Sequence, residues 1–239
     1  MDSLPSERDA LAWLMAEDDN LNKDEPQLAA AISEQLKHME LSSMDYITTR
    51  RIRDIALRHN PKKIIEVGGG IGYLSSWLLD IFSVQKIKPE YMIVESGNKF
   101  AAILLRLTQR FNATEWTKIL SMEFQELVGE CNAWLLSNQA LINSSTQTAV
   151  NSPAPVPSDL IIIDVGDADQ VECIRDGLTI LSKNGLLLTV EPAVPFEGAS
   201  NDHIDQFQHW IDLIREIKDT HRVAFSPLKT TTLVGIIPK

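Results

Sequence analysis

The chain has 239 residues, 44% of them hydrophobic, which is enough for one sizeable domain with its own core. Its formal net charge of −11 disfavours a DNA or RNA backbone as the main partner. No apolar run approaches the roughly 20 residues of a membrane span, and the acidic N-terminus resembles neither a signal peptide nor a transit peptide. We therefore expect a cytoplasmic protein without membrane contact, whose cysteines, Cys131 and Cys173, are reduced core residues.

The first part of the chain is expected to be helical. Residues 6–18 and 27–38 have the apolar spacing of amphipathic helices. Ser43 is a candidate N-cap for a longer helix over about residues 44–59, which ends before Pro61.

Charge is divided unevenly between these segments. Residues 1–40 hold ten acidic against three basic residues, whereas residues 41–63 hold six basic against two acidic residues. Two solvated helix faces are the simpler interpretation. The alternative is that the acidic segment docks on the basic helix, within one chain or between two.

Apolar strands then alternate with helices. The strands are expected at "KIIEV", "YMIVE", "TKILS", "DLIIID", "GLLLTVE", "RVAFSPL" and "TTTLVGII". The helices are expected at "GYLSSWLLDIF", "KFAAILLRLTQRF", and near 123–140, 169–182 and 202–218. Such alternation predicts a parallel sheet covered on both faces. Only Leu228 and Lys229 link the last two strands, so these two should pair antiparallel.

The predicted fold class is therefore α/β: a doubly wound, seven-stranded, mostly parallel sheet with an antiparallel C-terminal hairpin and N-terminal helices. We expect residues 1–42 to form a helical extension and residues 43–239 to form the main domain. Residues 141–158 are rich in Ser, Thr, Asn and Pro and predict a surface loop. This loop connects a helix to a strand, so it should lie at the N-terminal edge of the sheet, away from the edge where ligands bind.

The stretch "IIEVGGGIGY" joins the first strand to a helix, as a nucleotide-binding loop does. Its spacing is G-x-G-x-G, and Tyr73 stands where a dinucleotide fingerprint has its third glycine. No Gly-Lys-Ser/Thr follows, which excludes a P-loop. Glu66, just before the glycines, suits a cationic ligand group better than a pyrophosphate.

Three further strand ends carry side chains suited to a ligand. Glu95 ends the second strand and could accept both hydroxyls of a ribose. Met122 follows the third strand and could pack against an adenine ring. Asp164 ends the fourth strand. Each alone could be an exposed acid or a core methionine, but together with the glycine spacing they favour a binding site.

These segments resemble a known family. "IIEVGGGIGYLSSWLLD", "YMIVESGNKFAAILLRL", "DLIIID" and "LSKNGLLLTVEP" are similar to successive motifs of class I S-adenosylmethionine-dependent methyltransferases. Over about residues 43–239, the chain most resembles the catechol and caffeoyl-CoA O-methyltransferase group. The resemblance implies a Rossmann-like methyltransferase fold, S-adenosylmethionine as cofactor, and O-methylation of a small-molecule acceptor. The sequence is also compatible with a homodimer.

The resemblance also implies roles for individual residues. Glu66, the glycine loop, Tyr73 and Ser75 would hold the methionine end of the cofactor, Glu95 the ribose, and Met122 the adenine. The implied cofactor-binding set is Glu66, Gly68, Gly69, Gly70, Gly72, Tyr73, Glu95, Ser96, Ser121, Met122 and Asp164, with Glu123 at its border. The expected catalytic residues are Asp164 and Glu191.

Two positions depart from that group, which binds a divalent metal through the fourth-strand acid and an Asp-Asn pair after the fifth strand. Glu191 and Pro192 stand at the pair, and Pro192 offers no side-chain ligand. Asp167 stands where the group has a catalytic lysine. Whether a metal is used is therefore left open.

Three readings follow from these departures. In the first, the enzyme uses a metal with altered ligands, such as Asp164 and Glu191 with or without Asp167. Alternatively, it needs no metal and uses Glu191, Asp164 or a histidine, first of all His203, as general base. In the third reading the chain binds the cofactor without catalysis. An aminopropyltransferase is a further alternative, because those synthases share the fold and a similar glycine loop.

Acceptor contacts are expected from loops at the C-terminal edge of the sheet. These are residues 165–170 and 192–201, with residues 39–46 as a cover. Acidic side chains in these loops favour a small, partly apolar or cationic acceptor over a polyanion.

Overall fold

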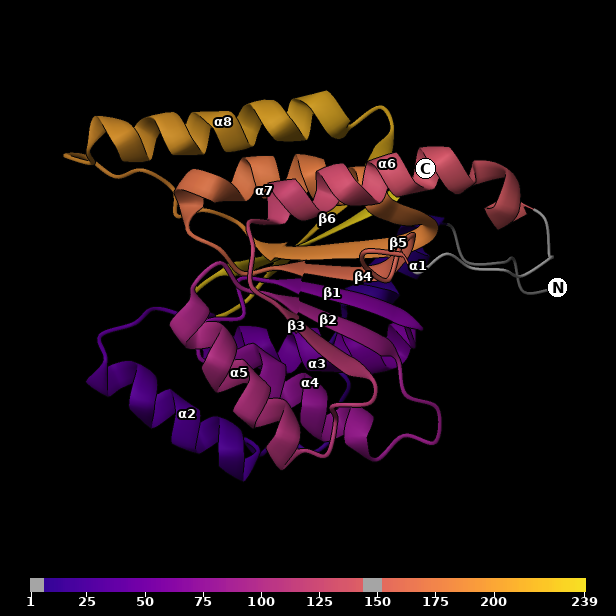
Figure 1. Ribbon diagram of the computed structural model, residues 1–239. Helices are drawn as coiled ribbons and strands as arrows, with labels where there is room; N and C mark the ends of the chain where they lie inside the picture. The colour runs from indigo at the N-terminus through magenta and orange to yellow at the C-terminus, as the bar shows by residue number, and fades with distance from the viewer. Residues whose placement is uncertain (1–6, 144–151) are drawn as a thin grey trace, which may run out of the picture.

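The computed structural model describes residues 7–143 and 152–239. Within these residues, seven strands form one sheet in the order β3-β2-β1-β4-β5-β7-β6 (Figure 1). The strands are β1 (Lys63–Val67), β2 (Glu90–Val94), β3 (Thr117–Leu120), β4 (Ser158–Ile163), β5 (Leu181–Val190), β6 (His221–Pro227) and β7 (Thr232–Pro238). The helices are α1 (Glu7–Met15), α2 (Gln27–His38), α3 (Tyr46–His59), α4 (Tyr73–Ser83), α5 (Asn98–Arg110), α6 (Phe124–Asn143), α7 (Asp167–Ile180) and α8 (Asn201–Ile217).

The sheet has the predicted topology. Strands β1 to β5 pair in parallel, while β7 pairs antiparallel with both β5 and β6. The chain winds from β1 toward β3 on one side and from β4 toward β5 on the other, so the strand order reverses between β1 and β4. In a doubly wound sheet, a ligand crevice forms at the carboxyl ends of the strands at this point.

Alternating side chains of the central strands bury both faces of the sheet. In β4, Ile161 and Ile163 pack toward α6, α7 and α8, whereas Leu160 and Ile162 pack toward α1, α3, α4 and α5. Figure 1 shows these two helix layers on opposite faces of the sheet. Because both faces are covered, the central strands are largely apolar, with Glu66 as the buried exception in β1. Cys131 and Cys173 are buried and free, as expected.

The start of α3 differs from the prediction. The N-cap is Asp45, whose Oδ1 accepts a hydrogen bond from the Thr48 backbone N–H at 2.8 Å. The expected cap, Ser43, was wrong: its hydroxyl donates to the Met44 carbonyl. Asp45 lies two residues closer to the first turn of α3 than Ser43 does, so its carboxylate can accept from the free N–H groups of that turn.

The prediction of a surface loop over residues 141–158 was wrong in part. Residues 144–151 lie outside the described part, but Ala154 and Val156 are only 2% exposed and belong to the core. Lys63 Nζ donates to the Val156 carbonyl at 2.8 Å. Because Lys63 begins β1, this segment lies at the N-terminal edge of the sheet, as the topology indicated.

The acidic N-terminal segment docks on the basic helix α3 of the same chain. Arg50 forms an ion pair with Glu17 at 2.6 Å. Arg53 donates to the Asn22 carbonyl, and Arg58 donates to three carbonyls at the end of α1 and just beyond it. The docking interpretation is thus confirmed, and the two charge blocks are not independent solvated faces. None of the helices in the described ranges combines the length and apolarity needed to cross a membrane.

Candidate functional site

The glycine loop joins β1 to α4 at the point where the strand order reverses. Gly68, Gly70 and Gly72 have φ values of 86°, 52° and 94°, a region that side-chain-bearing residues rarely adopt. A Cβ atom at Gly68 would lie 2.0 Å from the backbone oxygen of Asp164, whereas one at Gly70 would meet open space. The loop therefore packs tightly against β4 and presents its open side to the crevice.

Glu95, directly after β2, fixes this loop. Its Oε2 accepts a hydrogen bond from the Gly70 N–H at 2.7 Å, and its Oε1 accepts one from the Gly97 N–H at 2.8 Å. Each carboxylate oxygen has a second lone pair. Glu95 can therefore hold the loop and still accept hydrogen bonds from ligand hydroxyls.

Three cavities adjoin one another along the carboxyl edge of the sheet. We call them the small cavity (about 140 Å³), the middle cavity (about 190 Å³) and the large cavity (about 560 Å³). The small and middle cavities share Gly68, Glu95 and Val165 in their walls. The middle and large cavities share Asp164 and Val165.

The small cavity holds most of the side chains expected around an adenine. Ser96, Met122 and Glu123 line it, together with Glu95. Ser121 does not line it, because its hydroxyl donates to Asn98 Oδ1 at 2.8 Å.

The middle cavity lies against the glycine loop. Gly68, Gly69, Gly70 and Tyr73 line it, but Gly72 does not. Burial and the neighbouring Glu25 raise the pKa of Tyr73, whose hydroxyl donates to Glu25 Oε1 at 2.5 Å.

The expected cover lies over these cavities. Residues 41–43 line the middle cavity, and Met44 lines the large one. Leu36 of α2 also lines the middle cavity, so the N-terminal segment supplies part of its wall.

Glu66 and Ser75 lie beneath the loop, outside the lining of all three cavities. The Ser75 hydroxyl donates to Glu66 Oε1 at 2.7 Å, and the Tyr91 hydroxyl donates to Glu66 Oε2. Burial raises the pKa of Glu66 to about 7, although both hydroxyls counteract this effect. Glu66 thus connects β1, β2 and α4 in this structure.

Asp164 lies where the middle and large cavities meet. Burial raises its pKa to about 6, against a hydrogen bond from the Met44 backbone. Asp164 is therefore a carboxylate with a raised pKa at the border between two cavities. This position suits a general base.

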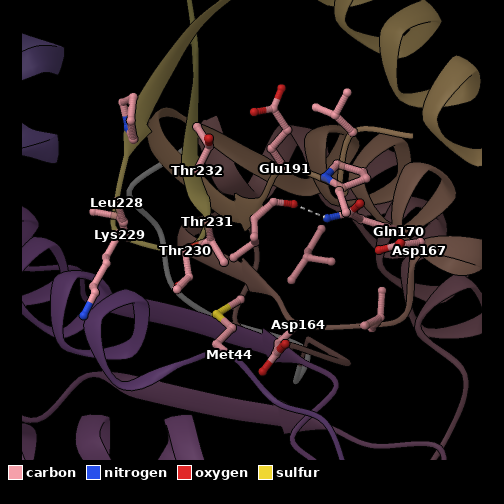
Figure 2. A pocket seen from close by; sticks show the side chains of 17 residues that line it. Met44, Asp164, Asp167, Gln170, Glu191, Leu228, Lys229, Thr230, Thr231 and Thr232 are labelled. Atoms are coloured by element: carbon pink, nitrogen blue, oxygen red, sulfur yellow. Dashed lines mark hydrogen bonds between the residues drawn. The ribbon is translucent and has the colours of Figure 1, made fainter. Parts of the chain in front are cut away.

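The large cavity is enclosed by the ends of β4 and β5, the start of α7, and the β6–β7 turn (Figure 2). Residues 227–232 of the turn form one wall, and Gln170 of α7 lies opposite in this view. The sequence interpretation missed the turn, although it included residues 165–170 and 192–201. Topology could have revealed it, because β7 runs antiparallel to β5 and so begins at the ligand edge.

The residues around Asp164 do not fit a divalent metal. Within the described ranges, no group of three His, Cys, Asp or Glu side chains could hold a metal ion. Asp164 and Glu191 both line the large cavity, but their carboxylates point away from each other (Figure 2). Pro192 lines the same cavity without a donor atom, and Asp167 is exposed at its rim.

His203 is placed outside the three cavities. Its Nε2 lies 2.8 Å from the Ala193 carbonyl oxygen, and its ring contacts the edge of Phe196. His203 thus fastens the β5–α8 loop and is not positioned as a general base.

No protein-family model matches the sequence, and no curated protein matches it. Solved structures do match. TomG from Streptomyces achromogenes, an O-methyltransferase of tomaymycin synthesis in complex with S-adenosylmethionine, has a TM-score of 0.64 at 11% identity, covering 90% of this chain and 91% of that one. A Staphylococcus aureus protein provisionally assigned as a caffeoyl-CoA O-methyltransferase has a TM-score of 0.67 at 16% identity, covering 89% and 93%.

A third match is the methyltransferase PaMTH1 from Podospora anserina, bound to S-adenosylhomocysteine. It has a TM-score of 0.62 at 16% identity, and the match covers 100% of this chain and 99% of that one. At these identities the likeness shows the fold: the chain has the α/β fold of S-adenosylmethionine-dependent O-methyltransferases.

Proposed function

We propose that this chain is an S-adenosylmethionine-dependent methyltransferase that methylates a hydroxyl group of a small molecule. The observation that carries the proposal is the meeting of the middle and large cavities at Asp164. The middle cavity lies against the glycine loop, whose G-x-G-x-G spacing suits S-adenosylmethionine. The large cavity offers space for an acceptor. Structural neighbours that contain S-adenosylmethionine or S-adenosylhomocysteine support this assignment.

The residues of the small and middle cavities fit the cofactor. Met122 would pack against the adenine, and Glu95 would accept hydrogen bonds from the ribose hydroxyls. Gly68 and Gly70 allow the backbone to approach the methionine end, and Tyr73 would border it. When bound, S-adenosylmethionine supplies a methyl group that its sulfonium already makes electrophilic.

The chain has then to align the acceptor and take up a proton. The walls of the large cavity would orient the acceptor hydroxyl toward the middle cavity. This would hold the hydroxyl oxygen in line with the methyl group, which lowers the entropic part of the barrier. Asp164 would accept the proton of that hydroxyl. The cover formed by residues 41–44 would exclude water from the place where the middle and large cavities meet.

One alternative has a specific observation in its favour. Asp167 and Pro192 replace the lysine and asparagine that the resemblance leads one to expect, which also suits a protein that binds the cofactor without catalysis. Transfer of a labelled methyl group to any acceptor would exclude it.

Titration calorimetry tests the proposal. S-adenosylmethionine and S-adenosylhomocysteine should bind at micromolar concentration or below, and Glu95→Gln should weaken both by about tenfold or more. Glu90→Gln is the matched control, because Glu90 is exposed at the opposite end of the same strand. Tighter binding of decarboxylated S-adenosylmethionine would favour aminopropyl transfer. A folded protein that binds none of the three would refute the proposal.

A further inference from the structure

Acidic side chains outnumber basic ones in the described lining of the large cavity. Asp164, Asp167 and Glu191 all line it, and the basic residue among its lining side chains is Lys229. In Figure 2, the Lys229 side chain extends away from Asp164 and Glu191. A ligand in this cavity therefore meets carboxylates without a nearby ammonium group.

The two threonine hydroxyls at the tip of the β6–β7 turn are already engaged. Thr230 donates to Asp45 Oδ2, and the Thr231 hydroxyl lies 2.8 Å from the Thr48 hydroxyl. These contacts fasten the turn to the start of α3. They hold the turn against α3 and occupy both hydroxyls.

Gln170, opposite the turn, adds an unpaired acceptor to the other wall. Its Nε2 donates to Thr189 Oγ1 at 2.8 Å and to the Val190 carbonyl at 2.6 Å. Thr189 in turn donates to the Ile163 carbonyl, which fixes the orientation of the Gln170 amide. Gln170 is 4% exposed, and its Oε1 has no hydrogen-bond partner among the residues that the structure describes. A buried acceptor without a donor is costly, so a ligand N–H group that reached this oxygen would relieve that cost.

A metal ion cannot satisfy these groups, because the carboxylates do not converge on one point. Carboxylates spread over separate walls are instead suited to an organic cation, which is larger than a metal ion and carries several N–H donors. Resting on the proposed function, we infer that the acceptor of this enzyme is a small organic cation with an ammonium or amidinium group, bound in the large cavity without a metal. Its hydroxyl would face Asp164, and its N–H groups would face Asp167, Gln170 and Glu191.

Two probes that differ in charge test the inference. Tyramine and para-hydroxyphenylacetate share a phenol and a similar length, but one is a cation and the other an anion. Each is titrated by calorimetry into the protein saturated with S-adenosylhomocysteine. Tyramine should bind about tenfold or more tightly than the acid, and added salt should reduce the difference.

Variants locate the effect in the large cavity. Glu191→Gln should reduce the preference for tyramine about threefold to tenfold, whereas Glu115→Gln, an exposed acid outside the cavity, should preserve it. A preference for the acid, or no binding of either probe while S-adenosylhomocysteine binds, would overturn the inference. Failure to bind S-adenosylhomocysteine would instead refute the proposed function.

Manganese supplies an independent readout. Titration of Mn²⁺ followed by electron paramagnetic resonance should show no site tighter than about millimolar, with or without S-adenosylhomocysteine. A micromolar Mn²⁺ site that Glu191→Gln abolishes would overturn the metal-free part of the inference.

Discussion

Asp164 is the side chain on which the proposed chemistry depends, because it borders both the middle and the large cavity. Asp164→Asn keeps the shape but removes the proton acceptor. We expect the methyl-transfer rate to fall by roughly 100-fold to 10,000-fold, with the affinity for S-adenosylhomocysteine changed only a few-fold. Single-turnover transfer and calorimetry measure the two quantities separately. An unchanged rate in this variant would remove Asp164 from the mechanism.

The same residue should set the pH dependence of the reaction. A general base acts when it is deprotonated, and burial raises the pKa of Asp164 to about 6. The maximal rate should therefore rise through about pH 6 and level off above it. A wild-type profile that is flat from about pH 5 to pH 8 would contradict this role.

Glu66 should make the stability depend on pH. Burial raises its pKa from 4.5 to about 7, so between these values the unfolded chain is ionised while the folded one holds the proton. The contribution of Glu66 to stability should thus be greatest below pH 4.5, fall as pH rises toward about 7, and then level off. Chemical denaturation should show that the wild type loses about 2 to 3 kcal/mol more than Glu66→Gln from about pH 5 to pH 8. Equal losses would mean that the two hydroxyls fully offset burial.

The close approach of the glycine loop to β4 gives a backbone test. In Gly68→Ala, the Cβ atom would lie 2.0 Å from the Asp164 backbone oxygen at a φ of 86°. We expect a loss of more than about 2 kcal/mol in urea unfolding. Gly129→Ala is the control, since an exposed helical glycine with open space around it should gain up to about 1 kcal/mol. A neutral Gly68→Ala would show that the loop is free to move.

At the scale of elements, the N-terminal segment is held on α3 mainly by arginines. Arg58 donates to the carbonyls of Trp13, Leu14 and Ala16 and pairs with Asp18 at 3.7 Å. Arg58→Ala should lower the free energy of unfolding by about 1 to 2 kcal/mol, because three carbonyls, two of them exposed and one partly buried, lose a charged donor.

Arg110→Ala, at an exposed position in the last turn of α5, is the matched control and should change stability by less than about 0.5 kcal/mol. Because Leu36 and residues 41–43 line the middle cavity, Arg58→Ala should also weaken the binding of S-adenosylhomocysteine. Equal stability of the two variants would show that the arginine contacts do not hold the segment.

The strands were predictable because their apolar runs are continuous. Burial on both faces favours this pattern in β2, β4 and β5, and in β1 apart from Glu66, so residue composition marks these strands. The cap of α3 was not predictable to the residue, since Ser43 and Asp45 are both good caps and the backbone decides between them. The burial of residues 154–156 depends on distant core contacts, which local composition does not encode.

At the scale of the whole molecule, the location of the site followed from topology. Glu95, Met122 and Asp164 end different parallel strands, so they had to meet at one edge of the sheet. It was less predictable which side chains near these three residues face the cavities. Glu66 and Ser121 occupy the expected region, but hydrogen bonds to Ser75, Tyr91 and Asn98 orient them elsewhere.

A crystal structure of the protein grown with S-adenosylhomocysteine and Mn²⁺ tests the central claim most directly. The proposal predicts adenine against Met122, ribose hydroxyls on Glu95, and the sulfur atom near Asp164 at the mouth of the large cavity. It also predicts no metal between Asp164 and Glu191. A manganese ion bound by both carboxylates would contradict the metal-free account, and a cleft without ligand at saturating concentration would contradict the proposed function itself.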